Sequence, residues 1–128
     1  MPQTIIQVYR KANGDVPLLE WLAELEEREP RAHAKCLDLL LRLESLGYEL
    51  RRPHADMLRD GIMELRARVG KVNYRMLYFF HGRNATIISH GITKEGKVPN
   101  IEIERALANK SFVERDPGIH LGEWSVSR

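Results

Sequence analysis

The chain has 128 residues and a mass of 14.8 kDa, which suffices for one domain but not for two separate cores. With 43% hydrophobic and 30% charged residues, its composition is typical of a folded soluble domain and excludes a disordered chain. No apolar run reaches a membrane span, and residues 1–4 lack the layout of a secretory signal, so we expect a cytoplasmic protein without membrane contact. The single cysteine, Cys36, excludes an internal disulfide and a cysteine-rich metal site, and we expect neither metal nor cofactor.

The small net charge of +2 conceals an uneven distribution along the chain. Residues 15–30 carry six acidic side chains against one basic side chain, whereas residues 51–75 carry seven basic side chains against three acidic ones. Such segregation indicates an anionic partner for the basic surface. The alternative is that both runs are ordinary solvated faces.

The first half of the sequence predicts a strand followed by two helices. Residues 4–9 are rich in β-branched and aromatic side chains, which favours a strand. Pro17 suits the first turn of a helix, and leucines at helical spacing follow it. Pro30 ends this helix and starts another over residues 31–46, whose apolar stripe precedes Gly47. We expect the two helices to form an antiparallel pair that covers a sheet.

The second half changes to the alternation of β-strands. Residues 63–69, 72–80 and 85–92 are predicted as strands, with turns at Gly70-Lys71 and around Gly82-Arg83. Residues 48–60 are expected to be irregular. Pro99 begins a last helix, and the segment after Lys110 is expected to be extended. The expected fold is α+β, with the order β-α-α-β-β-β-α, a small antiparallel sheet, a domain over residues 1–110 and a tail over 111–128.

The predicted turns fix which residues lie opposite one another. The first hairpin places Arg66 opposite Arg75 and Arg68 opposite Asn73, and the second places His90 opposite Arg75. Opposed like charges destabilise a strand pair by ~0.2–1 kcal/mol, and an anion between two arginines would remove that repulsion. We therefore expect a basic row across one sheet face, with nothing in the fold to neutralise it. The alternative is that Arg66 pairs with Glu64 or with the acidic first helix.

The two faces of the predicted sheet differ in composition. One face has apolar side chains that the helices can bury: Leu65, Ala67, Val69, Met76, Tyr78 and Ile87. The basic face has an apolar end of its own, which the last helix or Trp124 of the tail would cover: Leu77, Phe79 and Ile88.

The residues of the basic row suit cleavage of RNA through its own 2′-hydroxyl, which needs a base, an acid and cations near phosphorus but no metal. Arg66 and Arg75 remain charged at any working pH and suit the phosphate. His90 is a candidate base or acid because histidine titrates near neutrality. Lys94 is a candidate phosphate anchor or base, and His54 in the basic loop after Arg51 and Arg52 is a second candidate for proton transfer.

Three blocks of this sequence together resemble the RelE/ParE superfamily of type II toxins, in particular its phage-derived, HigB-like branch. They are Gly61–Arg66 (GIMELR), Asn73–Phe79 (NYRMLYF) and His90–Glu95 (HGITKE), followed by Pro99 and Ala106. The resemblance covers roughly residues 17–110. It implies a compact α+β fold with a helix after the last strand, and a cognate antitoxin, such as a small helix-turn-helix protein.

The resemblance also implies an activity, namely cleavage of messenger RNA on the ribosome. It assigns catalytic or phosphate-binding roles to Arg75, Arg66 and Lys94, beside which we place His90. The expected RNA-binding residues are Arg68, Asn73, Lys97, His54, Arg51 and Arg52. The sequence departs from the family pattern at Glu95, where the family often has a second basic residue. It departs again at Ile101, which lies near the position of a tyrosine in RelE-type toxins. A DNA gyrase inhibitor of the ParE type, or an inactive relative that only binds antitoxin or nucleic acid, are the alternatives.

Overall fold

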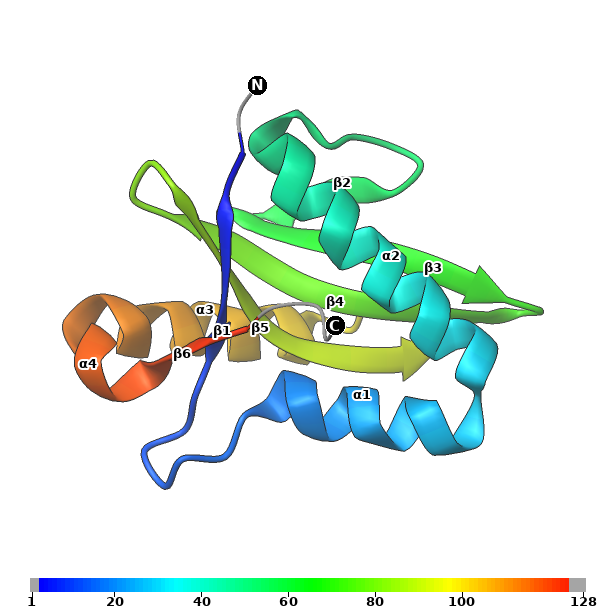
Figure 1. The fold of residues 1–128 in the computed structure, drawn as a ribbon, viewed down its shortest axis with the longest axis horizontal. Helices are drawn as coiled ribbons and strands as arrows, with labels where there is room; N and C mark the ends of the chain where they lie inside the picture. Colours follow the sequence, from blue (N-terminus) through cyan, green and yellow to red (C-terminus); the bar gives the residue numbers. More distant parts are fainter. Residues whose placement is uncertain (1–2, 125–128) are drawn as a thin grey trace.

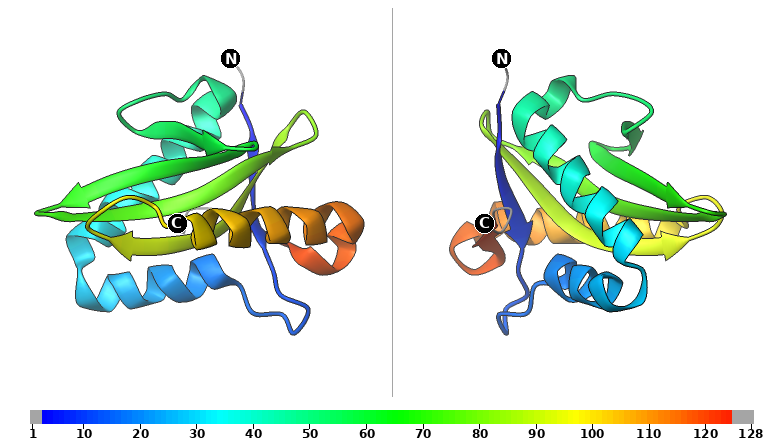
Figure 2. Two further views of the ribbon diagram at one scale, coloured as in Figure 1. Left: turned by 180° about the vertical axis from the view of Figure 1, so that it is seen from behind. Right: turned by 45° about the vertical axis from the view of Figure 1, so that its right-hand side comes forward.

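The computed structural model describes residues 3–124 and consists of three layers (Figure 1). Helices α1 (Pro17–Arg28) and α2 (Pro30–Leu46) cover one face of a six-stranded sheet, and α3 (Asn100–Arg115) covers the other, as the views in Figure 2 show. We call these the helix-pair face and the α3 face. Within residues 3–124 no helix combines the length and apolar character needed to cross a membrane.

The sheet is mixed rather than antiparallel. Its strands are β1 (Ile5–Tyr9), β2 (Ala55–Arg59), β3 (Ile62–Val69), β4 (Val72–His81), β5 (Ala85–Lys94) and β6 (Leu121–Glu123). They lie in the order β2-β3-β4-β5-β1-β6. The expectation of an antiparallel sheet is wrong at β1, which runs parallel to β5, and the α+β class is confirmed. The sequence also missed the edge strands β2 and β6, which are too short for a clear alternation.

The two N-terminal helices form where the sequence predicts them. Pro17 occupies the first turn of α1, and Leu18, Leu22 and Leu25 are buried on its inner side. Glu29 is extended, with φ −146° and ψ 78°, because the residue before a proline avoids helical geometry. This break lets the chain turn back into α2, which ends at Gly47 with a positive φ of 55°.

Each face of the sheet has its own core. The α1 and α2 leucines bury the helix-pair face, where Leu65, Met76 and Tyr78 lie as predicted. On the α3 face, residues from the sheet and the helix pack together: Leu77, Phe79, Ile87, Ile92, Ile103, Ala106 and Val113. The prediction that the last helix covers this apolar patch is confirmed, but Ile87 and Ile88 lie on the faces opposite to those predicted.

Most of the described part of the expected tail forms regular secondary structure. Residues 111–115 continue α3, a short helix α4 (Pro117–His120) follows, and β6 pairs with β1 at the sheet edge. Trp124 packs against the core of the helix-pair face rather than against Leu77 and Phe79. A short 3-10 helix, η1 (Gly47–Glu49), and β2 occupy the stretch expected to be irregular. Residues 125–128 lie outside the described range.

A close approach between α1 and β5 gives the first testable prediction. The indole of Trp21 occupies the space that a Cβ at Gly91 would need, and its Nε1 donates to Thr93 Oγ1 at 3.1 Å. Gly91→Ala must therefore push α1 away from the sheet, and we expect a loss of about 1–3 kcal/mol in the free energy of unfolding. Urea denaturation measures the loss. Gly96→Ala is the control, because a Cβ at Gly96 meets no heavy atom within 4 Å, and equal stability of both variants would contradict the prediction.

Candidate functional site

A cavity of about 400 Å³ opens on the α3 face between β3, β4 and the start of α3. We call it the basic cavity. Its lining comprises Leu58, Arg59, Glu64, Arg66, Arg75, Lys97, Val98, Asn100 and Ile103. Four cations and one carboxylate give these side chains a formal excess of three positive charges. Such a lining attracts an anion and excludes a cationic or purely apolar ligand.

The β3–β4 hairpin brings the two central arginines together as the sequence predicts. Gly70 begins the turn with a φ of 63°, and Arg66 lies opposite Arg75 and Arg68 opposite Asn73. Both predicted pairs are confirmed. Because directly paired residues point to the same side of a sheet, the two arginines share the α3 face.

The predicted partner of His90 is wrong. His90 lies opposite Leu77, and Ile92 lies opposite Arg75. Two irregularities explain the error: the turn between His81 and Ala85 has three residues rather than two, and a β-bulge interrupts the pairing after Leu77. The extra turn residue shifts the pairing of β5 with β4 by one residue, which moves Ile87 to the α3 face. The bulge shifts the pairing by one more residue, so His90 lies on the α3 face as predicted, although opposite a different residue.

The expectation that both arginines lack an internal partner is wrong for Arg75. Its Nε lies 2.9 Å from Oε1 of Glu64, and both side chains are only 6% exposed. This contact is an ion pair without a well-aligned hydrogen bond, since neither atom has a hydrogen-bond partner. The Nη1 of Arg75 donates to the carbonyl oxygen of Gly96 at 2.7 Å. Glu64 is the diagonal neighbour of Arg75 across the hairpin, close enough for long side chains to meet.

Arg66 is the more available of the two arginines. Its side chain is 40% exposed, and its Nη1 lies 4.0 Å from Oε2 of Glu64, at the limit of an ion pair. One carboxylate thus lies between two guanidinium groups and cannot neutralise both. The lining of the cavity thus keeps an excess of positive charge near Arg66, which an outside anion can compensate.

A second row of predicted residues adjoins this pair. Arg68, Asn73 and Lys94 lie opposite one another across three strands. Asn73 Nδ2 donates to the carbonyl oxygen of Glu95 at 3.2 Å, and Lys94 is exposed at the end of β5. Arg68 Nε donates to the carbonyl oxygen of Gly70 at 2.9 Å. The row lies two residues along the strands from Arg66 and Arg75, so it extends the basic surface toward the hairpin tip.

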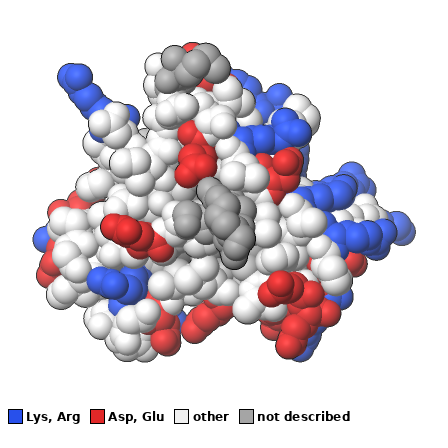
Figure 3. Space-filling model, in the orientation of Figure 1, with Lys and Arg blue, Asp and Glu red and all other residues white. Residues whose placement is uncertain are grey.

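The space-filling view shows the same segregation of charge that the sequence predicts. Lys and Arg gather at the right-hand side of Figure 3, where Figure 1 places the end of β3 and the start of β4. Asp and Glu gather below them, near the end of α1. The acidic helix does not cover the basic hairpin on this face of the molecule.

His90 is buried behind the cavity in a chain of hydrogen bonds. Its side chain is 1% exposed, and its Nε2 lies 2.9 Å from Glu102 Oε1 in α3. Its Nδ1 lies 2.7 Å from Ser89 Oγ, and this hydroxyl oxygen accepts a hydrogen bond from Asn109 Nδ2 at 2.9 Å. Burial, with help from Arg105 and against the effect of Glu102, lowers the pKa of His90 to about 4. The imidazole is therefore neutral at pH 7, accepting from Ser89 and donating to Glu102, which makes this contact a hydrogen bond rather than an ion pair.

The remaining predicted residues lie elsewhere. His54 lines a separate groove beside α2. Arg51 donates from Nη1 to the carbonyl oxygen of Tyr48 at 2.8 Å, and Arg52 pairs with Asp56 at 2.9 Å, both near the start of β2. The structure thus brings Arg66, Arg75 and Lys97 into one cavity. It leaves His54, Arg51 and Arg52 outside this cavity.

Three polar residues that line the cavity were not predicted from the sequence: Glu64, Arg59 and Asn100. Glu64 was considered only as a possible partner of Arg66, although the alternation of β3 already placed it on the arginine face. Arg59 belongs to β2, which was not predicted, and its Nε and Nη2 both donate to Asn100 Oδ1, at 3.2 and 2.6 Å. Arg59 thereby ties the first turn of α3 to the sheet and closes one side of the cavity. No cluster of three or more potential metal-binding His, Cys, Asp or Glu side chains occurs in the described part of the chain.

Comparison with known families assigns most of the chain to one family. Residues 20–111 match the family model described as phage-derived protein Gp49-like (DUF891), which lies in the RelE/ParE-like toxin clan. The chain belongs to this Gp49-like family, which is associated with the toxins of toxin–antitoxin systems. No curated protein matches the chain.

The lowered pKa of His90 predicts how stability depends on pH. The unfolded chain binds a proton near pH 6.5 but the folded chain only near pH 4, so protons favour unfolding between these values. We expect the free energy of unfolding to fall as the pH drops through this window, by on the order of 3 kcal/mol from this group. Urea denaturation at several pH values measures the slope.

His90→Gln removes the titrating group and should flatten the pH dependence, although it lowers stability at pH 7. His33→Gln, at a partly exposed position in α2, is the control and should keep the slope of the unmodified protein. An unchanged slope in His90→Gln would contradict the assignment.

Proposed function

We propose that this protein is the toxin of a type II toxin–antitoxin pair and a metal-independent endoribonuclease that cleaves messenger RNA on the ribosome. The observation that carries the proposal is the carboxylate of Glu64 between Arg75 and Arg66 in a cavity with an excess of positive charge. A carboxylate and two fixed guanidinium groups are the kinds of group that phosphodiester cleavage needs. Membership of the Gp49-like family supports the toxin class and suggests an antitoxin partner.

In the proposed reaction the 2′-oxygen of a ribose attacks the adjacent phosphorus. Glu64 accepts the 2′ proton, the P–O2′ bond forms and the P–O5′ bond breaks, leaving a 2′,3′-cyclic phosphate and a 5′-hydroxyl. Arg75 and Arg66 stabilise the negative charge that builds up on the phosphoryl oxygens. Phosphate binding would draw Arg75 from Glu64 and free the carboxylate to accept the proton.

The leaving 5′-oxygen needs a proton donor, and the cavity offers a lysine for it. Lys97 lines the cavity, and Lys94 follows in the neighbouring row at the end of β5. We assign proton donation to Lys97 and phosphate anchoring to Lys94, Arg68 and Asn73. Because it is buried and bonded to Glu102, His90 acts as a positioning residue that fixes the first turn of α3 at the cavity wall.

Burial of the central pair favours a second candidate function, an inactive relative that binds antitoxin or RNA without cleaving it. Arg75 and Glu64 are each 6% exposed, so a substrate phosphate must displace part of the loop around Gly96 to reach them. Arg66 and the second row, Arg68, Asn73 and Lys94, are accessible without this change and would suffice for binding. The gyrase-inhibitor alternative has no specific support in the cavity, and a supercoiling assay separates it from both.

Controlled expression tests the proposed activity. We expect growth arrest and new messenger RNA ends with the unmodified protein, and at least a hundredfold loss of cleavage in Glu64→Gln, because removal of a general base typically costs 10²–10⁴-fold (rough range). Arg66→Ala should lose a similar factor through the lost phosphate contact. Sequencing of RNA 5′ ends from treated ribosomes measures both.

Two controls keep this test interpretable. Arg83→Ala changes an exposed arginine in the β4–β5 turn, away from the cavity, and should remain toxic. Because Glu64→Gln leaves Arg75 without its buried partner, its melting temperature must be measured; Arg66→Ala alters a partly exposed residue and serves if Glu64→Gln unfolds. Intact messages with the unmodified protein, or full activity in Arg66→Ala, would contradict the nuclease proposal.

The proposed phosphate contacts also predict a dependence on salt. Binding to single-stranded RNA should weaken as ionic strength rises, since each neutralised phosphate releases bound counterions. Lys94→Ala should reduce the slope of log K against log salt by about 0.7, and Arg83→Ala should leave it unchanged. Fluorescence anisotropy over a salt series gives the slopes, and a flat series for the unmodified protein would sink the phosphate-contact assignment.

A further inference from the structure

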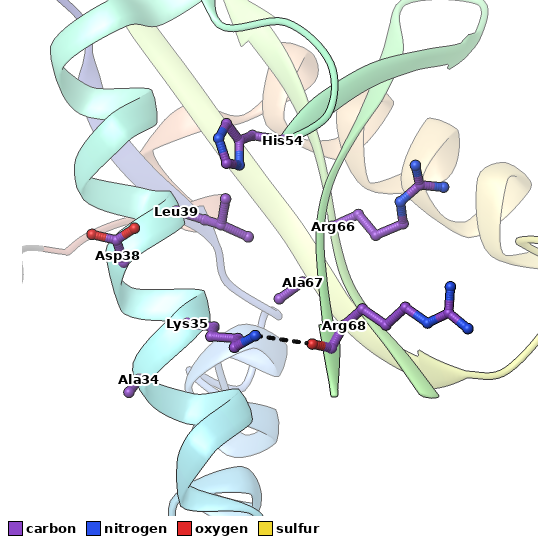
Figure 4. A pocket seen from close by; sticks show the side chains of 8 residues that line it. All are labelled: Ala34, Lys35, Asp38, Leu39, His54, Arg66, Ala67 and Arg68. Carbon is purple, nitrogen blue, oxygen red and sulfur yellow. Dashed lines mark hydrogen bonds between the residues drawn. The ribbon is translucent and has the colours of Figure 1, made fainter. Parts of the chain in front are cut away.

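A second hollow lies on the other side of β3 from the basic cavity. It is a groove of about 510 Å³ between α2 and the outer edge of β3, and we call it the edge groove (Figure 4). Its lining comprises Ala34, Lys35, Asp38, Leu39, His54, Arg66, Ala67 and Arg68. A largely apolar floor with a few polar groups at its rim is typical of a site for a small flat ligand, and the volume is in the usual range.

The groove exists because β2 is shorter than β3. The β2–β3 pairing ends with Ala55 opposite Leu65, so no strand covers β3 beyond that point on its outer side. The Arg66 N–H donates outward to His54, and by the alternation of the ladder the N–H and C=O of Arg68 also point outward. Lys35 Nζ donates to this carbonyl oxygen at 3.1 Å (Figure 4), which blocks the edge against an added protein strand.

The charges of the groove do not repel a nucleic acid strand. Its carboxylate, Asp38, already pairs with Arg42 at 2.9 Å along α2. The guanidinium groups of Arg66 and Arg68 extend side by side away from α2, onto the α3 face (Figure 4), so that only their backbone and stems line the groove. Arg66 lines both the edge groove and the basic cavity, and the two hollows therefore meet at this residue.

We propose that the edge groove binds a nucleobase of the RNA strand whose phosphate lies at Arg66, so that the strand crosses the outer edge of β3. This inference rests on the proposed function and adds a base site to it. The phosphates lie on the α3 face beside Arg66 and Arg68, and the flanking base packs on Leu39 and Ala67 beyond the edge. His54 and Lys35 at the rim hydrogen-bond the edge of the base, which gives His54 a role in binding.

A mutant cycle with an uncleavable RNA tests the base site. The probe is a 2′-O-methyl tetranucleotide, intact or with an abasic residue at each position in turn. Because a base that packs on the groove floor buries apolar surface, one abasic position should weaken binding to the unmodified protein by at least about fivefold. Ala34→Leu places a larger side chain in the groove from an exposed helical position, so no base can enter. This variant should therefore bind the intact probe and the probe with that abasic position equally. Ala23→Leu makes the same change on α1 and should behave like the unmodified protein.

The possible failures of this test point to different conclusions. If Ala34→Leu binds the intact probe like the unmodified protein, while Arg66→Ala binds it at least tenfold more weakly, the base site is overturned and the phosphate site stands. If Arg66→Ala also has no effect, the proposed function fails with it. A polyglutamate peptide that binds the unmodified protein but not Ala34→Leu, with RNA binding unaffected, would assign the groove to a protein partner and overturn the inference.

Discussion

Glu64 and Arg75 form a buried ion pair in a part of the sheet where several neighbouring side chains are apolar. Leu77, Ile92 and Ile103 surround them on the α3 face, and both charged side chains are 6% exposed. Replacing such a pair by apolar residues is often neutral or stabilising, because desolvation offsets the attraction between the charges. Stability alone therefore does not explain why this face holds a pair of charges beside an open cavity. The proposed reaction, in which a phosphate binds Arg75 and Glu64 accepts a proton, would give both charges a role.

The fold could be predicted from the sequence wherever local chemistry determined the structure. Pro17, Pro30, Gly47 and Gly70 mark helix starts, a helix end and the hairpin turn, and each acts through its own backbone preference. Pairing across that hairpin follows directly, so the meeting of the two arginines was predictable. The parallel pairing of β1 with β5 is a long-range contact, and no local signal in either strand indicates it.

The candidate site was only half predictable for the same reason. A β-bulge at Leu77 and one extra residue in a turn carry no distinctive sequence signal, yet they decide which residue lies opposite Arg75. The ion pair with Glu64 is a diagonal contact, which a row-by-row reading of the sheet does not consider. The burial of His90 depends on α3, whose position no pairing rule fixes. The sequence thus identified the charges and their face, whereas the neutralising partner and the buried network needed the tertiary structure.

Helix α3 forms one wall of the cavity and is held by polar as well as apolar contacts. Ile103, Ala106 and Val113 pack on the sheet, while Asn109 and Glu102 join the hydrogen bonds of Ser89 and His90. Apolar contacts alone tolerate small shifts of a helix along its axis, but directed hydrogen bonds do not. The polar network therefore fixes the position of the helix along its own axis.

That axial position decides where the first turn of α3 stands relative to the arginines. Glu102 is hydrogen-bonded to His90 of β5, and Asn100 is hydrogen-bonded to Arg59 of β2. The first turn of α3 is therefore held by a strand on each side of the β3–β4 pair. A shift by one helical turn, about 5.4 Å, would bring the helix over Arg75 or leave the cavity open on this side. The buried histidine thus contributes to the candidate site through geometry, and its neutral state at pH 7 lets Nδ1 accept from Ser89 while Nε2 donates to Glu102.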